Sequence, residues 1–344
     1  MASGSTTGLD LTRSQIVAFR RRAGALDQRL APGPESLRRA AWAGLQDSMP
    51  RAALLSIHAR VSGTESAAWA DPSLVQLWGP RYSVFVVAAC DLALFSLGTM
   101  PDDAKGRLRA ETLAAELAAA LGGERVPHQE AGSRLGVHPN RLRYAAATGT
   151  VVIRWEGARQ PTVWIVPAPE LTAREARLEL ARRYLHSYGP TTAAAFGGWA
   201  GIGPRPALAA FEALREELIL VRTPVGPAWL LAADEGDARA EPGPTAPARL
   251  LPSGDSFFLL QGADRDLLVP EPAQRAQLWT SRVWPGALLV DGDLAGTWRR
   301  AGAVLTVQSW RPLSAPERDA VEAEAASLPI PGIEGHVTVR WDDA

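Results

Sequence analysis

The sequence predicts an α+β fold made of three tandem winged-helix units, each a helix-turn-helix followed by a β-hairpin wing, and a small C-terminal β-barrel-like domain. Three observations predict this fold. Hairpin patterns begin near residues 83, 150 and 217, so successive starts are 67 residues apart. Each hairpin follows a helix, a short helix and another helix, which is typical of a repeated supersecondary unit. After residue 247 the pattern changes to short strands. An ordinary α+β protein with evenly spaced hairpins is the alternative.

These patterns divide the 344 residues into six segments. They are an N-terminal arm or helix (1–33), winged helices 1, 2 and 3 (34–100, 101–168 and 169–233), a linker (234–248) and a β-rich domain (249–344).

The first unit follows a basic, amphipathic segment from Thr12 to Leu30 that ends at Pro32-Gly-Pro34. A hairpin is predicted from Tyr82 to Leu97, turning at Cys90-Asp91. Helical spacing of apolar residues predicts helices over Glu35–Leu45, Arg51–Val61 and Pro72–Trp78.

The second unit contains the clearest winged-helix pattern. A long helix is predicted from Asp102 to Leu121, where Gly122-Gly123 is a typical stop. A short helix over His128–Leu135 and a basic helix over Pro139–Ala147 follow. The wing is predicted over Val151–Trp155 and Thr162–Val166, on either side of Glu156-Gly157.

The third unit begins at Thr172, which has Glu175 three residues later, as in a capping box. This signal predicts a helix that runs to about Tyr188. The remaining elements are a short helix through Trp199, a helix over Pro206–Glu217, and a hairpin formed by Leu218–Val221 and Trp229–Leu231.

The C-terminal segment follows the stretch Ala232–Pro247, which is acidic and then rich in proline, as in a linker or exposed loop. One helix is predicted over Ala315–Leu328. Strands are predicted over Arg249–Leu260, Leu267–Val269, Val283–Asp291, Thr297–Arg300, Val304–Trp310 and Gly335–Trp341.

The composition excludes several classes of protein. The single cysteine, Cys90, excludes an internal disulfide and a cysteine-built zinc site. Five histidines are scattered without metal-ligand spacing, and no phosphate loop, dinucleotide fingerprint or nucleophile elbow is present. No run approaches the roughly 20 apolar residues of a membrane span. We therefore expect a cytoplasmic protein without a metal or cofactor.

Basic residues on the second unit are the best candidates for contact with double-stranded DNA. Arg141, Arg143 and Tyr144 lie on the basic helix, where they could read or brace a groove. A plain solvated face is the alternative for the two arginines. The net charge of −1 leaves DNA binding open, because binding depends on local clusters. The wing offers Arg154, Arg159 and Gln160 for phosphate or minor-groove contact.

Several motifs, in their order along the chain, resemble the tandem winged-helix family that includes the AlkZ-like DNA glycosylases. The run Ala43–Arg60 is similar to the first family signature. Leu250–Asp255, Asp264-Arg265 and Val290–Arg299 are similar to later ones, so the resemblance covers roughly residues 35 to 342. It implies three winged helices curved into a C shape, a C-terminal β-barrel, and excision of alkylated purines, including interstrand crosslinks in some members.

The resemblance also implies a catalytic signature, Gln-x-Gln or Gln-x-Asp, near the first winged helix. Gln46-Asp47-Ser48 occupies that place, so Gln46 agrees with the signature and Ser48 departs from it. Gln46 is the first candidate catalytic residue, followed by Ser48 and Asp47. Capping of the next helix is the alternative role for Asp47 and Ser48.

Two functions follow from these observations. The first is a DNA glycosylase that hydrolyses the N-glycosidic bond of alkylated purines, where the leaving base is already cationic and needs no strong general acid. The second is a non-catalytic winged-helix protein, either a regulator or a binder of damaged DNA. Gln46 and the resemblance favour the enzyme, whereas Ser48 favours the non-catalytic protein. A weaker third option is an array that binds protein or RNA.

Overall fold

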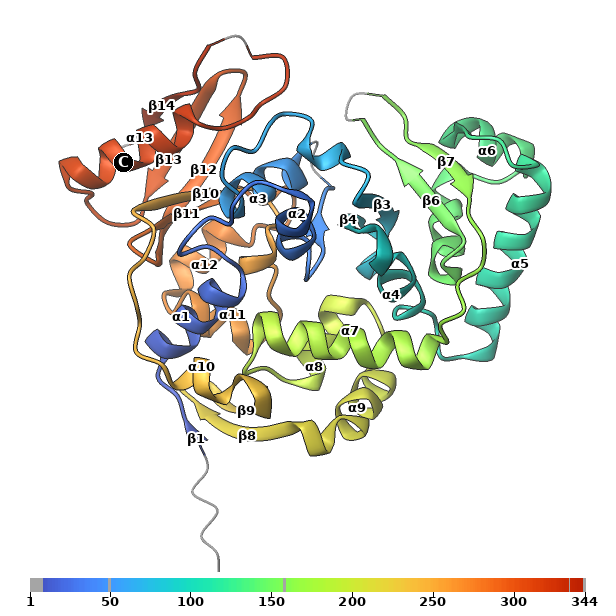
Figure 1. The fold of residues 1–344 in the computed structure, drawn as a ribbon, viewed down its shortest axis with the longest axis horizontal. Coiled ribbons are helices and arrows are strands. Elements are labelled where there is room, and N and C mark those ends of the chain that lie inside the picture. Colours follow the sequence, from blue (N-terminus) through green and yellow to red (C-terminus); the bar gives the residue numbers. More distant parts are fainter. Residues whose placement is uncertain (1–8, 49–50, 157–158, 334, 343–344) are drawn as a thin grey trace, which may run out of the picture.

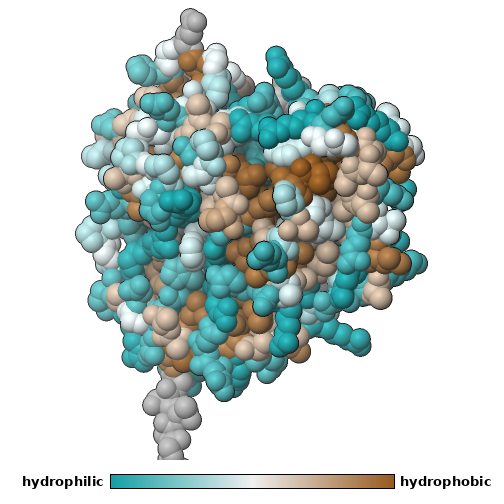
Figure 2. Space-filling view, turned by 45° about the vertical axis from the view of Figure 1, so that its right-hand side comes forward, coloured by the Kyte–Doolittle hydropathy of each residue, from teal (hydrophilic) through white to brown (hydrophobic). Residues whose placement is uncertain are grey.

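The chain folds into three β-sheets that are surrounded and connected by helices (Figure 1). The computed structural model describes residues 9–48, 51–156, 159–333 and 335–342. Within these ranges, no helix is both long enough and apolar enough to span a membrane. The face shown in Figure 2 is largely hydrophilic, with hydrophobic residues gathered in patches between the hydrophilic ones.

The helices and strands have the following bounds. The α-helices are α1 (Arg13–Ala23), α2 (Pro34–Ala40), α3 (Ala52–Arg60), α4 (Leu92–Leu97), α5 (Ala104–Leu121), α6 (His128–Arg134), α7 (Ala173–Tyr188), α8 (Ala193–Ala200), α9 (Pro204–Ala213), α10 (Glu235–Arg239), α11 (Ala263–Leu268), α12 (Pro272–Leu278) and α13 (Ala315–Ala326). The strands are β1 (Leu9–Asp10), β2 (Leu45–Gln46), β3 (Leu74–Trp78), β4 (Val84–Ala88), β5 (Val126–Pro127), β6 (Val151–Arg154), β7 (Thr162–Ile165), β8 (Leu218–Thr223), β9 (Gly226–Leu231), β10 (Ala248–Leu251), β11 (Gly286–Val290), β12 (Asp293–Ala301), β13 (Val304–Ser309) and β14 (Thr338–Trp341).

A six-stranded sheet, in the order β2-β4-β3-β6-β7-β5, joins the predicted first and second units. Its first hairpin is β3–β4, so the prediction of a helix over Pro72–Trp78 was wrong. The prediction of a hairpin over Tyr82–Leu97 was also wrong, because only Val84–Ala88 is a strand and Leu92–Leu97 is helix α4. Short apolar runs fit a buried strand and a buried helix equally well, and here cross-strand pairing decides between them. The hairpins therefore begin at residues 74, 151 and 218, and their spacing is not equal.

The predictions for the second and third units agree more closely with the structure. The two hairpins predicted as wings form as β6–β7 and β8–β9. The capping box of Thr172 and Glu175 is confirmed at the start of α7. The basic helix over Pro139–Thr148 is a 3-10 helix rather than an α-helix. Gly157, in the predicted turn of the wing, lies outside the described residues.

The C-terminal sheet is open, in the order β10-β11-β12-β13-β14, and among the described residues no sheet closes into a barrel. The prediction of a barrel-like domain was therefore wrong. Residues 267–269 were predicted as a strand, but they contain the end of helix α11, and α12 was not predicted. Part of the predicted linker is helix α10. Alternating strands predict a curved sheet, but closure depends on whether the edge strands pair, which the local pattern does not encode.

Buried ion pairs attach the C-terminal segment to the N-terminal helices. Asp255 accepts two hydrogen bonds from Arg60, at 2.7 and 2.8 Å, and a third from Ser56 at 2.6 Å. Asp264 accepts a hydrogen bond from Arg20 at 2.7 Å. Two of the sequence motifs that carry the family resemblance thus contribute buried carboxylates that hold the fold together.

Candidate active site

Strand β2 places Gln46 in the lining of a cleft. β2 pairs with β4, with Leu45 opposite Val86 and Gln46 opposite Phe85. Successive strand residues face opposite sides, so Leu45 is buried and Gln46 is half-buried. The preceding Gly44 has φ +72°, and a Cβ there would lie 2.7 Å from the Phe95 ring. A larger residue at position 44 would therefore displace the start of β2.

The side chain of Gln46 is held by Arg81 and Gly254. Nη2 of Arg81 donates a hydrogen bond to Oε1 of Gln46 at 3.0 Å, and Nη1 donates to the carbonyl oxygen of Trp199. Gly254, at φ +75°, approaches so closely that a Cβ there would lie 3.2 Å from Nε2 of Gln46. Burial lowers the pKa of the Arg81 guanidinium, but an arginine side chain in a protein stays protonated at neutral pH.

The cleft beside Gln46 has a volume of ≈ 380 Å³. Ser48 is exposed on its wall, two residues from Gln46. The lining residues are Gln46, Ser48, Arg81, Ser83, Ser253, Gly254, Leu259, Gln261, Arg282, Val283 and Trp284. None of these described lining residues is acidic. The cleft can therefore orient a neutral molecule by hydrogen bonds, and its arginines attract anions.

Asp47 points away from this cleft into the interior, where it is 1% exposed. Its carboxylate accepts hydrogen bonds from the backbone N–H of Ala53 at 3.0 Å and from Nε2 of Gln76 at 2.8 Å. The first of these bonds satisfies a donor in the first turn of α3, as a helix cap does. Burial raises the pKa of Asp47 to about 6, against the effect of these hydrogen bonds. Met49 and Pro50, in the same loop, lie outside the described residues.

The three candidates on the basic 3-10 helix differ in exposure. Arg141 is exposed, whereas Arg143 and Tyr144 are half-buried. The Tyr144 ring packs edge-on against Tyr82 with the ring centres 4.8 Å apart, and the Arg143 guanidinium lies 5.4 Å from the Tyr144 ring centre. Tyr144 therefore contributes to the contact between the first and second units, and Arg143 packs on Tyr144.

Of the three wing candidates, one packs against an aromatic ring and two are exposed. The Arg154 guanidinium lies 4.1 Å from the centre of the Trp69 ring, and Arg51 lies 3.9 Å from the same ring. Arg159 and Gln160 are exposed, and Nε2 of Gln160 donates a hydrogen bond to Oε1 of Gln129. The wing thus presents Arg159 and Gln160 outward, while Arg154 contacts the first unit. None of the wing or 3-10 helix candidates lines the cleft that contains Gln46.

A family model described as "DNA glycosylase AlkZ-like" matches residues 39–329. The chain belongs to the AlkZ-like DNA glycosylase family. Its structure is similar to that of the Streptomyces sahachiroi DNA glycosylase AlkZ, with a TM-score of 0.78 and 20% sequence identity over 97% of this chain and 100% of that one. No curated protein matches the chain in sequence. At this identity the solved structure shows a shared fold.

For this AlkZ-like protein, sequence reasoning missed three features of the site. Arg81 binds Gln46, Gly254 packs against Gln46, and Arg282 and Trp284 also line the cleft. The motif Leu250–Asp255 could have indicated Gly254, because glycine beside aspartate often marks a turn. We find no local signal for Arg81. The described residues contain no group of three or more metal-ligating side chains placed to hold an ion.

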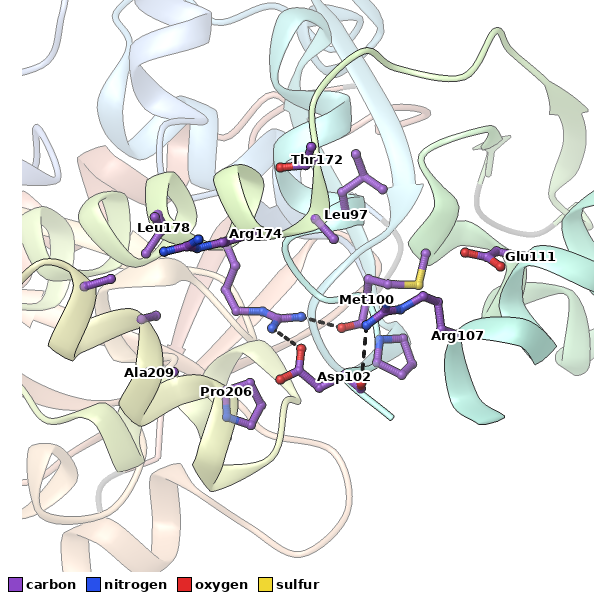
Figure 3. A pocket seen from close by; sticks show the side chains of 15 residues that line it. Leu97, Met100, Asp102, Arg107, Glu111, Thr172, Arg174, Leu178, Pro206 and Ala209 are labelled. Atoms are coloured by element: carbon purple, nitrogen blue, oxygen red, sulfur yellow. Dashed lines mark hydrogen bonds and ion pairs between the residues drawn. The ribbon is translucent and has the colours of Figure 1, made fainter. Parts of the chain in front are cut away.

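A larger cavity of this AlkZ-like protein, with a volume of ≈ 690 Å³, lies between α5, α7 and α9 (Figure 3). Arg177 stabilises one wall by donating to Oδ1 of Asp102 and to the carbonyl oxygen of Met100, both at 2.5 Å. None of the candidate catalytic or DNA-binding residues lines it. We therefore place the candidate chemistry in the smaller cleft that contains Gln46.

Proposed function

We propose that this protein is a monofunctional DNA glycosylase that hydrolyses the N-glycosidic bond of alkylated purines in double-stranded DNA. The observation that carries the proposal is the fixed side chain of Gln46 in a cleft that also contains Ser48. Membership of the AlkZ-like family supports the same conclusion. The resistance of a cell to DNA-alkylating agents is the biological role that this activity would serve.

The chemistry follows from what Gln46 can do. A carbonyl oxygen has two lone pairs, so Oε1 of Gln46 can accept a hydrogen bond from Arg81 and a second one from a water molecule. The water, held near the anomeric carbon, forms the new C–O bond as the C–N bond to the base breaks, and its proton passes to the solvent. An N7-alkylated purine is already cationic, so it leaves as a neutral base without a general acid. The Ser48 hydroxyl would provide a second hydrogen bond to the same water.

We also propose that the three helix–hairpin units are winged helices, with the domain limits given by the sequence patterns. The supporting observations are the wings β6–β7 and β8–β9 and the helices before them. DNA would contact the exposed Arg141, Arg159 and Gln160 directly. Tyr144 and Arg154 contact the first unit and Arg143 packs on Tyr144, so these three side chains would support that surface from behind.

The test is release of free base from a duplex that contains 7-methylguanine. The wild-type protein should release the base, and Gln46→Ala should abolish release without changing the melting temperature. Gln277→Ala, on α12 and outside the cleft, is the matched control and should retain full activity. Absence of release by the wild-type protein would overturn the proposal.

A non-catalytic DNA-binding protein is the second candidate, and a specific observation favours it. Ser48 is neutral where the family signature has glutamine or aspartate, and Asp47 is engaged in the interior. The cleft therefore lacks a carboxylate among its described lining residues. This candidate predicts tight binding of alkylated or crosslinked duplex without release of base. A binding titration run beside the base-release assay measures both quantities.

A further inference from the structure

A second cavity adjoins the cleft that contains Gln46. Its volume is ≈ 250 Å³, and it shares Ser253, Val283 and Trp284 with that cleft as lining residues. Val283 and Trp284 thus form a ridge with the candidate catalytic residue on one side and the second cavity on the other. We refer to the two adjoining cavities together as the groove; their lining extends from Gln46 to Arg299 and Arg300 on β12.

The far end of this groove is basic. Arg299 and Arg300, consecutive on β12, line the second cavity and are exposed, and Arg282 lines the first cavity and is also exposed. Within the described residues, none of these three arginines has a carboxylate within ion-pair distance. Neither cavity has an acidic residue in its described lining. The groove therefore has uncompensated positive charge along its length.

The arginines at the far end are partly fixed in place. Nη2 of Arg299 donates to the carbonyl oxygen of Val283 at 3.0 Å, and Nη1 of Arg300 donates to that of Gly302 at 2.6 Å. A guanidinium has five N–H donors, so one such bond leaves donors for an anion. The second cavity is also lined by the apolar or aromatic side chains of Leu55, Trp284 and Trp298. A basic groove with aromatic walls is suited to a nucleic-acid backbone whose sugars and bases pack on the rings.

We propose that this groove binds the sugar–phosphate backbone of the DNA strand that enters the cleft, with Arg299 and Arg300 as phosphate ligands. The inference rests on the proposed function for the identity of the strand in the cleft. It extends that function by assigning a phosphate site on the C-terminal sheet, away from the 3-10 helix and the wing. Arg299 and Arg300 contact phosphate rather than base edges, so they contribute affinity without sequence preference.

The experiment is binding of the full-length protein to a fluorescent duplex with a central tetrahydrofuran abasic site, between 50 and 200 mM KCl. Each phosphate contact contributes about 0.9 to the slope of log K against log salt for duplex DNA. Arg299→Ala and Arg300→Ala should each reduce the slope by about 0.9. Between 50 and 200 mM KCl the affinity of each protein falls by some factor, and for the double variant this factor should be about tenfold smaller than for the wild-type protein. Arg340→Ala, an exposed arginine on β14 of the same sheet, is the control and should leave the slope unchanged.

Lysine variants separate a phosphate contact from a structural role. Arg299→Lys and Arg300→Lys keep the charge and should retain the wild-type slope. Slopes of the alanine variants equal to the wild-type slope would overturn the inference. Base release from 7-methylguanine DNA is scored separately. Base release with unchanged slopes would support the proposed glycosylase and contradict phosphate binding in this groove. Reduced slopes without base release would support phosphate binding in the groove and contradict the proposed glycosylase.

Discussion

Arg81 donates a hydrogen bond to Oε1 of Gln46 across 3.0 Å, although the two residues are 35 positions apart in the chain. The same guanidinium binds the carbonyl oxygen of Trp199, near the end of α8. Arg81 itself has φ +56°, a left-handed conformation that places its side chain between these two partners. The orientation of the Gln46 amide therefore depends on how the third unit packs against the first.

Replacement of Arg81 should reduce the chemical step more than DNA binding. In Arg81→Met the Gln46 amide loses a charged hydrogen bond, and the single-turnover rate of base release should fall roughly 10- to 100-fold. The dissociation constant for DNA should change much less than the rate, because the Arg81 guanidinium is already bonded to Gln46 and to the carbonyl oxygen of Trp199. Arg81→Lys should restore part of the rate. Single-turnover assays and binding titrations measure the two effects.

The matched control for Arg81 is Arg239→Met, on α10, where an exposed arginine forms an ion pair with Glu235 at 2.8 Å. It should leave both the rate and the affinity unchanged. A parallel loss of rate and affinity in Arg81→Met would show that Arg81 serves binding or folding instead of the orientation of Gln46.

A carboxylate at position 48 should increase the rate. Ser48 is exposed in the cleft two residues after Gln46, and Ser48→Asp would create the Gln-x-Asp signature of the family. A carboxylate attracts the proton of the attacking water and stabilises the cationic transition state, so the rate should rise on the order of 10-fold or more. Ser83→Asp places the same charge elsewhere in the cleft and is the control. Equal effects of both variants would contradict a special role for position 48.

Asp47 should make stability depend on pH between about 4 and 6. Burial raises its pKa in the folded state from 3.8 to about 6, so the folded protein binds the proton more tightly than the unfolded chain. The stabilisation from this group is complete below pH 4 and is lost as pH rises through 6. The free energy of unfolding of the wild type, relative to Asp47→Asn, should fall by roughly 3 kcal/mol at most across this range.

Urea denaturation of both proteins at several pH values measures this difference. Asparagine has no proton to lose, so the variant supplies the reference curve for all other titrating groups. The difference in free energy of unfolding between the two proteins could instead stay constant, or change with rising pH in favour of the wild type. Either result would contradict burial as the dominant cause of the pKa shift of Asp47.

Local signals account for the parts of the fold that the sequence predicted. The long helix α7 begins at a capping box whose two partners are three residues apart, so the signal lies within one turn. The strand β3 has no such signal. Its residues Leu74–Trp78 are strand because β4 pairs with them and Gln76 lies opposite Ile153 of β6. Such pairing depends on residues far away in sequence, and the apolar run alone could not specify it.

The candidate site divides in the same way. Gln46 could be predicted because the family resemblance rests on consecutive residues, and a capping role for Asp47 was an open alternative that its contact with Ala53 now supports. Arg81 and Gly254 reach Gln46 only through the packing of separate segments. The positive φ of Arg81 could not be predicted from the sequence either, because arginine does not favour the left-handed region.

The ion pair between Arg60 and Asp255 should contribute most to holding the C-terminal segment on α3. Both side chains are 2% exposed or less, and the carboxylate also accepts hydrogen bonds from Ser56 and from the backbone N–H of Phe257. Asp255→Asn leaves a buried arginine without its counter-charge and should reduce the free energy of unfolding by about 3–5 kcal/mol. Asp10→Asn breaks the exposed pair with Arg222 and should have no measurable effect. A double-mutant cycle with Arg60→Met, measured by urea denaturation, isolates the pair. A combined loss equal to the sum of the single losses would show that the two residues stabilise the fold independently.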